Sequence, residues 1–279
     1  MNNKFIKVLI PIIVFIIAFI IIYPIHKDNK DVMMDKEVKS NTKYIPILTF
    51  HRLVPDDVKK EIYPDNQWVG SSKVFEEMID YLYKNEYKTI STEEFYKWYN
   101  GEVDYDNKTI VITFDDGFYE DYYLAYPILK KYDYKATSFV VGSRIKDKTD
   151  KYDKYKTSFI GLDVINKVRK EYPNFEFQSH SYNMHYYTQG KKHRIKTMSY
   201  EQLQEDTKLN EPFKFTTMAY PYGDFNQNIQ EVLENNNYLV AFRFGPSDYA
   251  TRDSDRYAIP RIKINGNADI TTLKKWLDY

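Results

Sequence analysis

Two neighbouring carboxylates follow a run of strand-forming residues in the segment VITFDDGFYED, residues 111–121. Asp115 and Asp116 carry like charges, so each disfavours ionisation of the other. A protein retains such a pair where it binds a metal ion, where it needs a paired acid and base, or where a turn exposes both groups to water. Because Asp-Gly is a common turn dipeptide, this segment taken alone leaves a turn and a functional site equally open.

A pair of histidines forms a second cluster. His180 ends the strand-like run FEFQSH, and His185 follows it five residues later in SHSYNMH. Metal-binding histidines on one helix prefer a spacing of four, so a spacing of five after a strand indicates a loop that folds back. One aspartate and two histidines make a three-ligand set with an open position for water, as in catalytic zinc sites. A metal ion would also relieve the repulsion between the aspartates, and the spare aspartate could take a proton from the water.

The segments around these residues alternate between strand and helix patterns, which is typical of a parallel sheet with helical crossovers. Capping-box patterns begin two helices, with Ser91 and Glu94 in one and Ser199 and Gln202 in the other. The pattern predicts strands at residues 44–51, 108–114, 135–141, 175–180, 215–219, 238–244 and 257–264, helices at residues 71–87, 91–99, 122–132, 161–172, 199–209, 226–237 and 270–279, and an irregular loop at residues 52–68.

Three polar clusters follow the ends of predicted strands. They are the aspartate pair at residues 115–116, the histidine pair, and the AYPYG turn at residues 219–223. In α/β barrels, the carboxyl ends of the parallel strands form the edge where sites assemble. The sequence therefore predicts that three separate segments meet on one face of one sheet.

An uncharged apolar segment precedes the predicted domain. Residues 8–25 would span roughly 27 Å as a helix, close to the thickness of a bilayer core. Lys4 and Lys7 precede it and no A-x-A-like cleavage site follows, so we expect an uncleaved single-pass anchor with the remaining chain outside the cell. Cleavage would instead give a secreted domain. The expected parts are an N-terminus and anchor at residues 1–26, a flexible tether at residues 27–43 and one domain at residues 44–279.

The composition excludes several classes of chemistry. Lys plus Arg and Asp plus Glu number 40 each, so no long-range field favours a nucleic-acid partner. The chain has no Cys, which excludes disulfides, thiolate ligands and a cysteine nucleophile. The 28 Tyr and 17 Phe suit stacking on sugars as well as ordinary packing. We expect a monomer.

The three motifs TFDDG, HSYNMH and AYPYG, in this order, resemble those of the polysaccharide deacetylase family, also called the NodB-homology family or carbohydrate esterase family 4. The histidine spacing and the AYPYG that replaces the more usual Arg-x-Pro-Tyr are similar to one branch, the intercellular-adhesin-type deacetylases of biofilm poly-β-1,6-N-acetylglucosamine. That branch often begins its domain with a Tyr-His-x-Val-like strand end, and FHRLV at residues 50–54 is similar. The resemblance covers Tyr44 to the C-terminus.

The resemblance implies a fold and a reaction. The fold is α/β, a distorted (β/α) barrel, and the reaction is metal-dependent removal of acetyl from an N-acetylated sugar. Asp115 would act as the general base. Asp116, His180 and His185 would hold a divalent metal, with zinc expected first and cobalt, nickel or iron left open. The backbone N–H of Tyr222 would help to stabilise the tetrahedral oxyanion.

Further residues have expected roles in presenting the substrate. Pro221 would shape the turn that carries Tyr222, and Gly223 would permit the backbone path of that turn. Tyr182 lies inside the histidine loop and is expected to contact the sugar.

The chain departs from the wider family pattern in two places. The wider pattern has a late Leu-x-x-His that supplies a general acid, but the last histidine here is His193, expected in a solvated loop. Ala219 replaces the arginine that normally touches the base aspartate. Arg261 could make that contact instead, or it could form a surface or structural ion pair. His51 is expected to be a structural or rim residue, so the group that protonates the leaving amine stays open.

These expectations give one leading function and two alternatives. The leading hypothesis is an extracellular, membrane-anchored N-deacetylase of surface poly-β-1,6-N-acetylglucosamine or a related glycan, which contributes to biofilm or surface adhesion. Deacetylation would expose amines and make a neutral polymer cationic. A peptidoglycan or chitooligosaccharide deacetylase would use the same chemistry. A catalytically inactive glycan-binding module is the alternative of another class, because the late histidine is missing.

Overall fold

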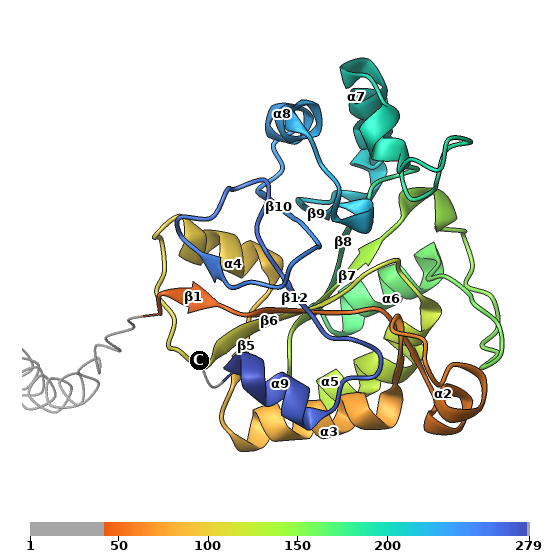
Figure 1. The fold of residues 1–279 in the computed structure, drawn as a ribbon, viewed down its shortest axis with the longest axis vertical. Coiled ribbons are helices and arrows are strands. Elements are labelled where there is room, and N and C mark those ends of the chain that lie inside the picture. Colours follow the sequence, from red (N-terminus) through yellow and green to blue (C-terminus); the bar gives the residue numbers. More distant parts are fainter. Residues whose placement is uncertain (1–41, 278–279) are drawn as a thin grey trace, which may run out of the picture. The chain divides into compact units, whose positions relative to one another are not determined.

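A curled parallel sheet forms the centre of residues 42–277, the part of the chain that the computed structural model describes (Figure 1). Its strand order is β10-β9-β8-β7-β6-β2-β12, with β5 paired to β6. The strands of this sheet are β2 (Ile47–Phe50), β5 (Lys88–Thr89), β6 (Thr109–Phe114), β7 (Ala136–Val140), β8 (Phe175–Ser179), β9 (Thr217–Ala219), β10 (Val240–Phe242) and β12 (Ile262–Lys263). Two small pairs stand apart, β1 (Tyr44–Ile45) with β11 (Ala250–Thr251) and β3 (Arg52–Val54) with β4 (Val69–Ser71).

Helices connect the parallel strands, as the alternating pattern predicts. They are α2 (Asp56–Ile62), α3 (Ser72–Lys84), α4 (Thr92–Tyr99), α5 (Tyr126–Lys131), α6 (Leu162–Glu171), α7 (Tyr200–Lys208), α8 (Gln227–Asn235) and α9 (Ile270–Leu277). In Figure 1, α3, α5 and α9 gather along one side of the sheet, and α7 packs beside α8. Both predicted capping boxes are confirmed at the starts of α4 and α7.

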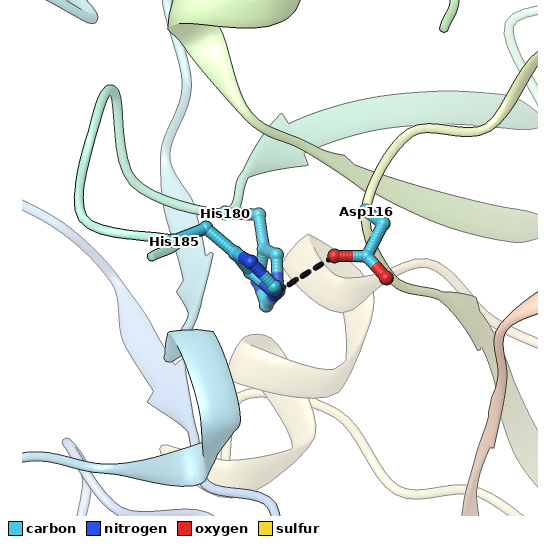
Figure 2. A group of neighbouring side chains, drawn as sticks. All are labelled: Asp116, His180 and His185. Carbon is cyan, nitrogen blue, oxygen red and sulfur yellow. Dashed lines mark ion pairs between the residues drawn. The ribbon is translucent and has the colours of Figure 1, made fainter. Parts of the chain in front are cut away.

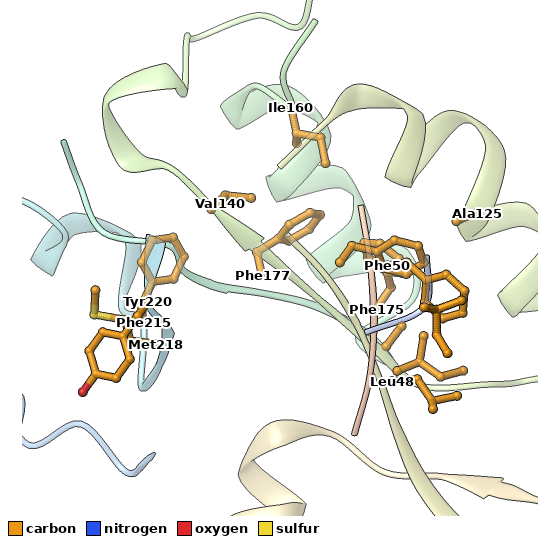
Figure 3. Close-up of a cluster of buried hydrophobic side chains, with 14 of the residues drawn as sticks. Leu48, Phe50, Ala125, Val140, Ile160, Phe175, Phe177, Phe215, Met218 and Tyr220 are labelled. Carbon is orange, nitrogen blue, oxygen red and sulfur yellow. The ribbon is translucent and has the colours of Figure 1, made fainter. Parts of the chain in front are cut away.

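The core divides according to the alternation of side chains along the strands. Leu48 and Ile112 belong to the larger cluster of buried side chains, whereas their neighbours Ile47 and Val111 belong to a second cluster with Trp98 of α4. Figure 3 shows part of the larger cluster, which includes aromatic side chains from β2, β8 and the region of β9. Because both faces of β6 are covered, all six of its residues are buried. The α/β class is confirmed.

The structure corrects three details of the predicted elements. Residues 52–68 are not an irregular loop, because they contain β3 and α2, whose Val54 and Val58 form a small core of their own with Val69. The helix predicted at 122–132 begins as a π-helix at Asp121–Ala125 and continues as α5. The strand predicted at 257–264 is reduced to β12, since Pro260 lacks the N–H that a ladder requires.

The expected membrane anchor at residues 1–26 lies outside the described residues, and so does the expected tether up to residue 41. Among residues 42–277, no helix combines the length and the apolar character that a membrane crossing requires. The anchor, the tether and the boundary at residue 44 therefore stay predictions.

Candidate active site

The three polar clusters lie together at one end of the sheet, as predicted from their positions after strands. The aspartate pair follows β6, His180 follows β8, and the AYPYG turn begins in β9. Potential ligand atoms of Asp116, His180 and His185 all lie within 4.8 Å of one another. Figure 2 shows these side chains pointing toward one another from separate segments.

A hydrogen bond of His180 determines which of its ring nitrogens faces Asp116. His180 Nδ1 donates to the carbonyl oxygen of Ala219 at 2.8 Å, because a carbonyl can only accept. The lone pair of His180 is therefore on Nε2, which lies 3.8 Å from Asp116 Oδ1. His185 Nε2 lies 2.8 Å from the same oxygen. Asp116 Oδ1 is buried and accepts no hydrogen bond from the described residues. A divalent cation would satisfy these donor atoms, so the cluster fits a metal ion.

Electrostatics keeps the cluster ready to bind a cation. Burial lowers the pKa of His180 to about 4, against the opposing effect of Asp115 and Asp116, so its ring is neutral near pH 7. Burial alone would raise the pKa of Asp116, but contacts with His185 and His180 hold that pKa far below the ordinary value. Asp116 therefore presents a carboxylate and His180 a neutral imidazole, the forms that ligate metals.

Asp115 forms a separate, buried ion pair. Arg261 Nη1 donates to Oδ1 at 2.8 Å and Nη2 donates to Oδ2 at 2.7 Å. Both side chains are almost fully buried. Burial alone would raise the pKa of Asp115, but the Arg261 guanidinium lowers it below the ordinary value. The structure thus places Arg261 on the predicted base, where the sequence left this contact and a structural ion pair equally open.

Left-handed backbone conformations occur at all three strand ends. Asp116 has φ 77°, Ser181 has φ 65° and Tyr222 has φ 61°. Such angles are uncommon for residues other than glycine and cluster where a site requires a particular side-chain direction. Gly117 has φ +68°, and a Cβ there would lie 2.8 Å from a Val140 methyl group. The backbone is therefore shaped to aim these side chains.

The AYPYG turn is held tightly against the rest of the site. Gly223 has φ +73°, and a Cβ at this position would lie 1.9 Å from the Phe244 carbonyl oxygen. The Gly223 N–H donates to Tyr220 and the Asp224 N–H donates to Pro221, so both amides are used inside the turn. Pro221 is buried and is the first residue of the single helical turn Pro221–Gly223. The role of the Tyr222 N–H stays a prediction.

The cluster opens into a pocket of about 690 Å³. Its lining combines the predicted chemistry with aromatic side chains: Asp115, Asp116, His180, His185 and Tyr222 are joined by Trp68, Tyr187 and Phe244. Trp68 and Tyr187 are well exposed. Tyr182 is not among the residues that line this pocket, and its backbone N–H donates to Asp206. The sugar contact expected of Tyr182 stays a prediction.

Two histidines outside the predicted site also line the pocket, His51 and His193. His51 follows β2, whose Phe50 pairs with Phe114 of β6, so His51 is level with Asp115. Its ring packs against Trp68 and Phe244 at centroid distances of 4.9 and 5.4 Å. The signal available in the sequence was the position of His51 at the end of a predicted strand.

His193 offered no such signal. It lies in the basic run GKKHRIK, which was expected to be a solvated loop. The structure instead stacks its ring on Tyr222 and pairs its Nδ1 with Asp224. No signal in the sequence placed Arg144 in the site either. Its Nη1 lies 3.7 Å from Asp116 Oδ1.

Comparisons with known proteins agree with this geometry. Residues 102–241 match the family model described as Polysaccharide deacetylase. Proteins named poly-β-1,6-N-acetyl-D-glucosamine N-deacetylase are similar to this chain: that of Staphylococcus epidermidis is 26% identical over 266 residues, covering 87% of this chain and 86% of that protein. That of Staphylococcus aureus MRSA252 is 26% identical over 294 residues, covering 95% and 96%.

Solved structures share the fold. The Streptococcus pyogenes deacetylase PplD, solved in complex with acetate, has a TM-score of 0.70 at 22% identity and covers 84% of this chain and 98% of that chain. IcaB from Ammonifex degensii has a TM-score of 0.68 at 19% identity and covers 85% and 98%. These similarities confirm the predicted distorted (β/α) barrel. The family match spans half of the chain and includes both aspartates and both clustered histidines. The chain therefore belongs to the polysaccharide deacetylase family, whose members are hydrolases of amide bonds in N-acetylated polysaccharides.

Proposed function

We propose that this protein is a metal-dependent N-deacetylase of poly-β-1,6-N-acetylglucosamine. The observation that carries the proposal is the convergence of Asp116, His180 and His185 beside the Asp115–Arg261 pair in one pocket. The names of the two staphylococcal relatives support this choice of polymer. A pocket of this volume is within the range of small-ligand sites, and its exposed aromatic rim suits the apolar faces of sugars.

Asp116, His180 and His185 would hold the metal. One carboxylate and two imidazoles with an open position is the ligand set of catalytic zinc, so zinc is the first expectation. Cobalt, nickel and iron accept the same donor atoms, and cellular supply can decide between them. When bound, the ion would supply Lewis acidity to the acetamide carbonyl and to the attacking water.

Asp115 acts as the general base in this proposal. Arg261 keeps its carboxylate ionised near neutral pH, and each carboxylate oxygen retains a lone pair that can take a proton. The N–H of Tyr222 donates to the oxyanion that develops on the acetamide. The chain itself therefore supplies a proton acceptor and an oxyanion donor in one pocket.

His51 is the group we assign to protonation of the leaving amine. It lines the pocket level with Asp115 and does not belong to the metal cluster. Burial lowers the pKa of His51, although Asp115 and Asp116 oppose this, so the ring is neutral near pH 7. His51 would therefore receive the proton that Asp115 takes from water and pass it to the amine.

We also propose that the domain works outside the cell, held by the apolar segment at residues 8–25. The positive charges before this segment and the polymeric substrate support this location. Released amines would make the polymer cationic and able to hold anionic surfaces, which fits a role in biofilm adhesion. Protease treatment of intact cells should degrade the domain if it is exposed at the outer surface.

The test is metal-restored acetate release from defined glycans. The protein would be stripped with a chelator, supplied with zinc, cobalt or nickel, and assayed on poly-β-1,6-N-acetylglucosamine, peptidoglycan and chitooligomers. We expect release from the first polymer only. Release confined to another glycan would keep the chemistry and reject the proposed polymer, and glycan binding without release would indicate a binding module.

Asp115→Asn tests the assignment of the base. We expect acetate release to fall by about 10²–10⁴-fold, because that is what a positioned base contributes. Metal affinity, measured by titration, should be retained, because Asp115 is not among the clustered ligands. Full activity of this variant would reject the assignment.

A further inference from the structure

The segment between His185 and α7 folds back over the pocket as a hairpin. The Thr188 N–H donates to Lys192 and the Arg194 N–H donates to Tyr186, and Tyr187 pairs with His193 in an antiparallel bridge. We refer to residues 186–194 as the hairpin. Its tip is exposed, but its base brings His193 against the AYPYG turn. The hairpin is therefore docked on the turn at one defined point.

Tyr222 lies in a stack of rings at this point. The His193 ring covers one side of it almost in parallel, with a centroid distance of 4.0 Å and an interplanar angle of 11°. The His185 ring lies 4.4 Å from Tyr222 and the Tyr187 ring lies 5.0 Å away. The rotation of the Tyr222 side chain is therefore restricted by rings from the hairpin and from the metal cluster.

A second contact fixes His193 itself. Its Nδ1 pairs with a carboxylate oxygen of Asp224, and the other oxygen of Asp224 lies 2.8 Å from Lys196 Nζ. Asp224 is two residues after Tyr222, so the turn anchors the same histidine that covers its own tyrosine. His193 therefore joins the hairpin to the turn through two contacts, the stack on Tyr222 and the ion pair with Asp224.

The backbone of the turn has an unfavourable conformation that these contacts can stabilise. Tyr222 has a left-handed backbone at φ 61°, a conformation that costs energy for a residue with a side chain. The backbone at Gly223 runs so close to Phe244 that a Cβ there would clash with the Phe244 carbonyl. The ring stack adds contacts that favour the observed position of Tyr222 over relaxed alternatives.

We propose that His193, anchored by Asp224, is a positioning residue that holds Tyr222 and so aims its backbone N–H at the developing oxyanion. The inference rests on the proposed function and adds a residue to its machinery. His193 acts through Tyr222 and does not touch the reacting atoms. Because a misplaced donor weakens binding of the transition state more than binding of the substrate, the effect belongs in kcat and leaves KM nearly unchanged.

The experiment compares variants of the full-length, zinc-loaded protein on oligomers of poly-β-1,6-N-acetylglucosamine. His193→Ala should lower kcat about tenfold, less than the loss on removing an oxyanion donor, with KM within about twofold. His193→Phe keeps a flat ring and should recover most of kcat. Lys192→Ala is the matched control, because Lys192 is an exposed neighbour in the same hairpin, and it should match the wild type.

A double-mutant cycle separates positioning from a general structural role. If His193 acts through the Tyr222 ring, His193→Ala should have little further effect on kcat in a Tyr222→Ala background. Additive losses, or a change confined to KM, would overturn the inference. Zinc affinity of His193→Ala should match the wild type, and a loss of zinc affinity together with kcat would also overturn it.

The wild-type protein distinguishes a failure of the role of His193 from a failure of the proposed function. Wild-type protein that releases acetate, with His193→Ala equally active, rejects the role of His193 alone. Wild-type protein that binds zinc but releases no acetate from these oligomers rejects the proposed function, and the role of His193 is rejected with it.

Discussion

At the scale of single residues, the two aspartates of the pair contact different partners. Asp115 is held by Arg261 through two hydrogen bonds. Asp116 instead faces His180 and His185. The repulsion that makes the pair unusual in the sequence is thus offset separately for each carboxylate, which allows one to act as a base and the other as a ligand.

Arg261→Met should expose how much Asp115 depends on its partner. The substitution leaves a buried carboxylate unpaired, so we expect the free energy of unfolding to fall by about 3–5 kcal/mol. The pKa of Asp115 should rise, because burial then acts without the guanidinium. The acidic limb of the pH–rate profile should therefore move to higher pH. Urea unfolding and rates of acetate release between pH 4 and 8 measure both effects.

The double variant Asp115→Asn/Arg261→Met is the control for stability. It removes both charges, so part of the lost stability should return. Unchanged stability and an unchanged acidic limb in Arg261→Met would show that the observed ion pair does not govern Asp115.

At the scale of elements, the sequence predicts where the site forms better than how its side chains are aimed. Alternating strand and helix patterns were enough to place three polar clusters at one edge of a parallel sheet. The left-handed backbones at Ser181 and Tyr222 could not be predicted, because these residue types rarely adopt that conformation, and Asp adopts it only occasionally, so Asp116 gave a weak signal. Tertiary packing determines the position of the hairpin that carries His193 into the site. The local sequence of this basic, polar segment therefore predicts only a solvated loop.

For residues 52–68, the sequence predicts a loop where the structure has a strand and a helix. Pro55, Pro64 and several charges are typical of a loop, and the helix they contain is short. Its stability comes from packing of Val54, Val58 and Val69, which no local pattern reveals. Local propensity was overridden here by a small core of its own.

Gly223→Ala should disrupt the turn through both backbone strain and a clash. Its φ of +73° disfavours any side chain, and the new Cβ would meet the Phe244 carbonyl at 1.9 Å. We expect the free energy of unfolding to fall by more than about 2 kcal/mol and acetate release to be lost. Thermal unfolding and the activity assay measure the two effects.

Two other glycines provide matched controls for this variant. Gly101→Ala has φ +76° but no heavy atom within 4 Å of the new Cβ, so it isolates strain, at about 1 kcal/mol. At Gly190 no neighbouring atom lies within 4 Å either, and no left-handed φ is present, so Gly190→Ala should be nearly neutral. If Gly223→Ala behaved like Gly101→Ala, the close approach to Phe244 would not constrain the turn.

At the scale of the whole molecule, stability depends on pH through two sets of buried groups that act in opposite directions. His180 has a pKa of about 4 in the folded protein and 6.5 ordinarily, so the unfolded chain binds its proton first as pH falls. Its contribution to the free energy of unfolding is therefore lost between pH 6.5 and 4. Burial raises the pKa of Glu120, Asp121, Glu176 and Asp206, which act in the opposite direction.

The share of His180 is therefore measured as a difference between two proteins. In chelator-treated samples, the wild type should lose stability relative to His180→Asn as pH falls from 6.5 to 4, by at most about 1.4 kcal/mol per pH unit. The raised carboxyls are common to both proteins and cancel. Urea unfolding at pH 4.5, 5.5 and 6.5 measures the difference, and a difference that is constant with pH would mean that His180 is not held neutral by burial. Because metal ligation requires the neutral imidazole, protonation of His180 in the folded protein should weaken zinc binding only as the pH falls to about 4.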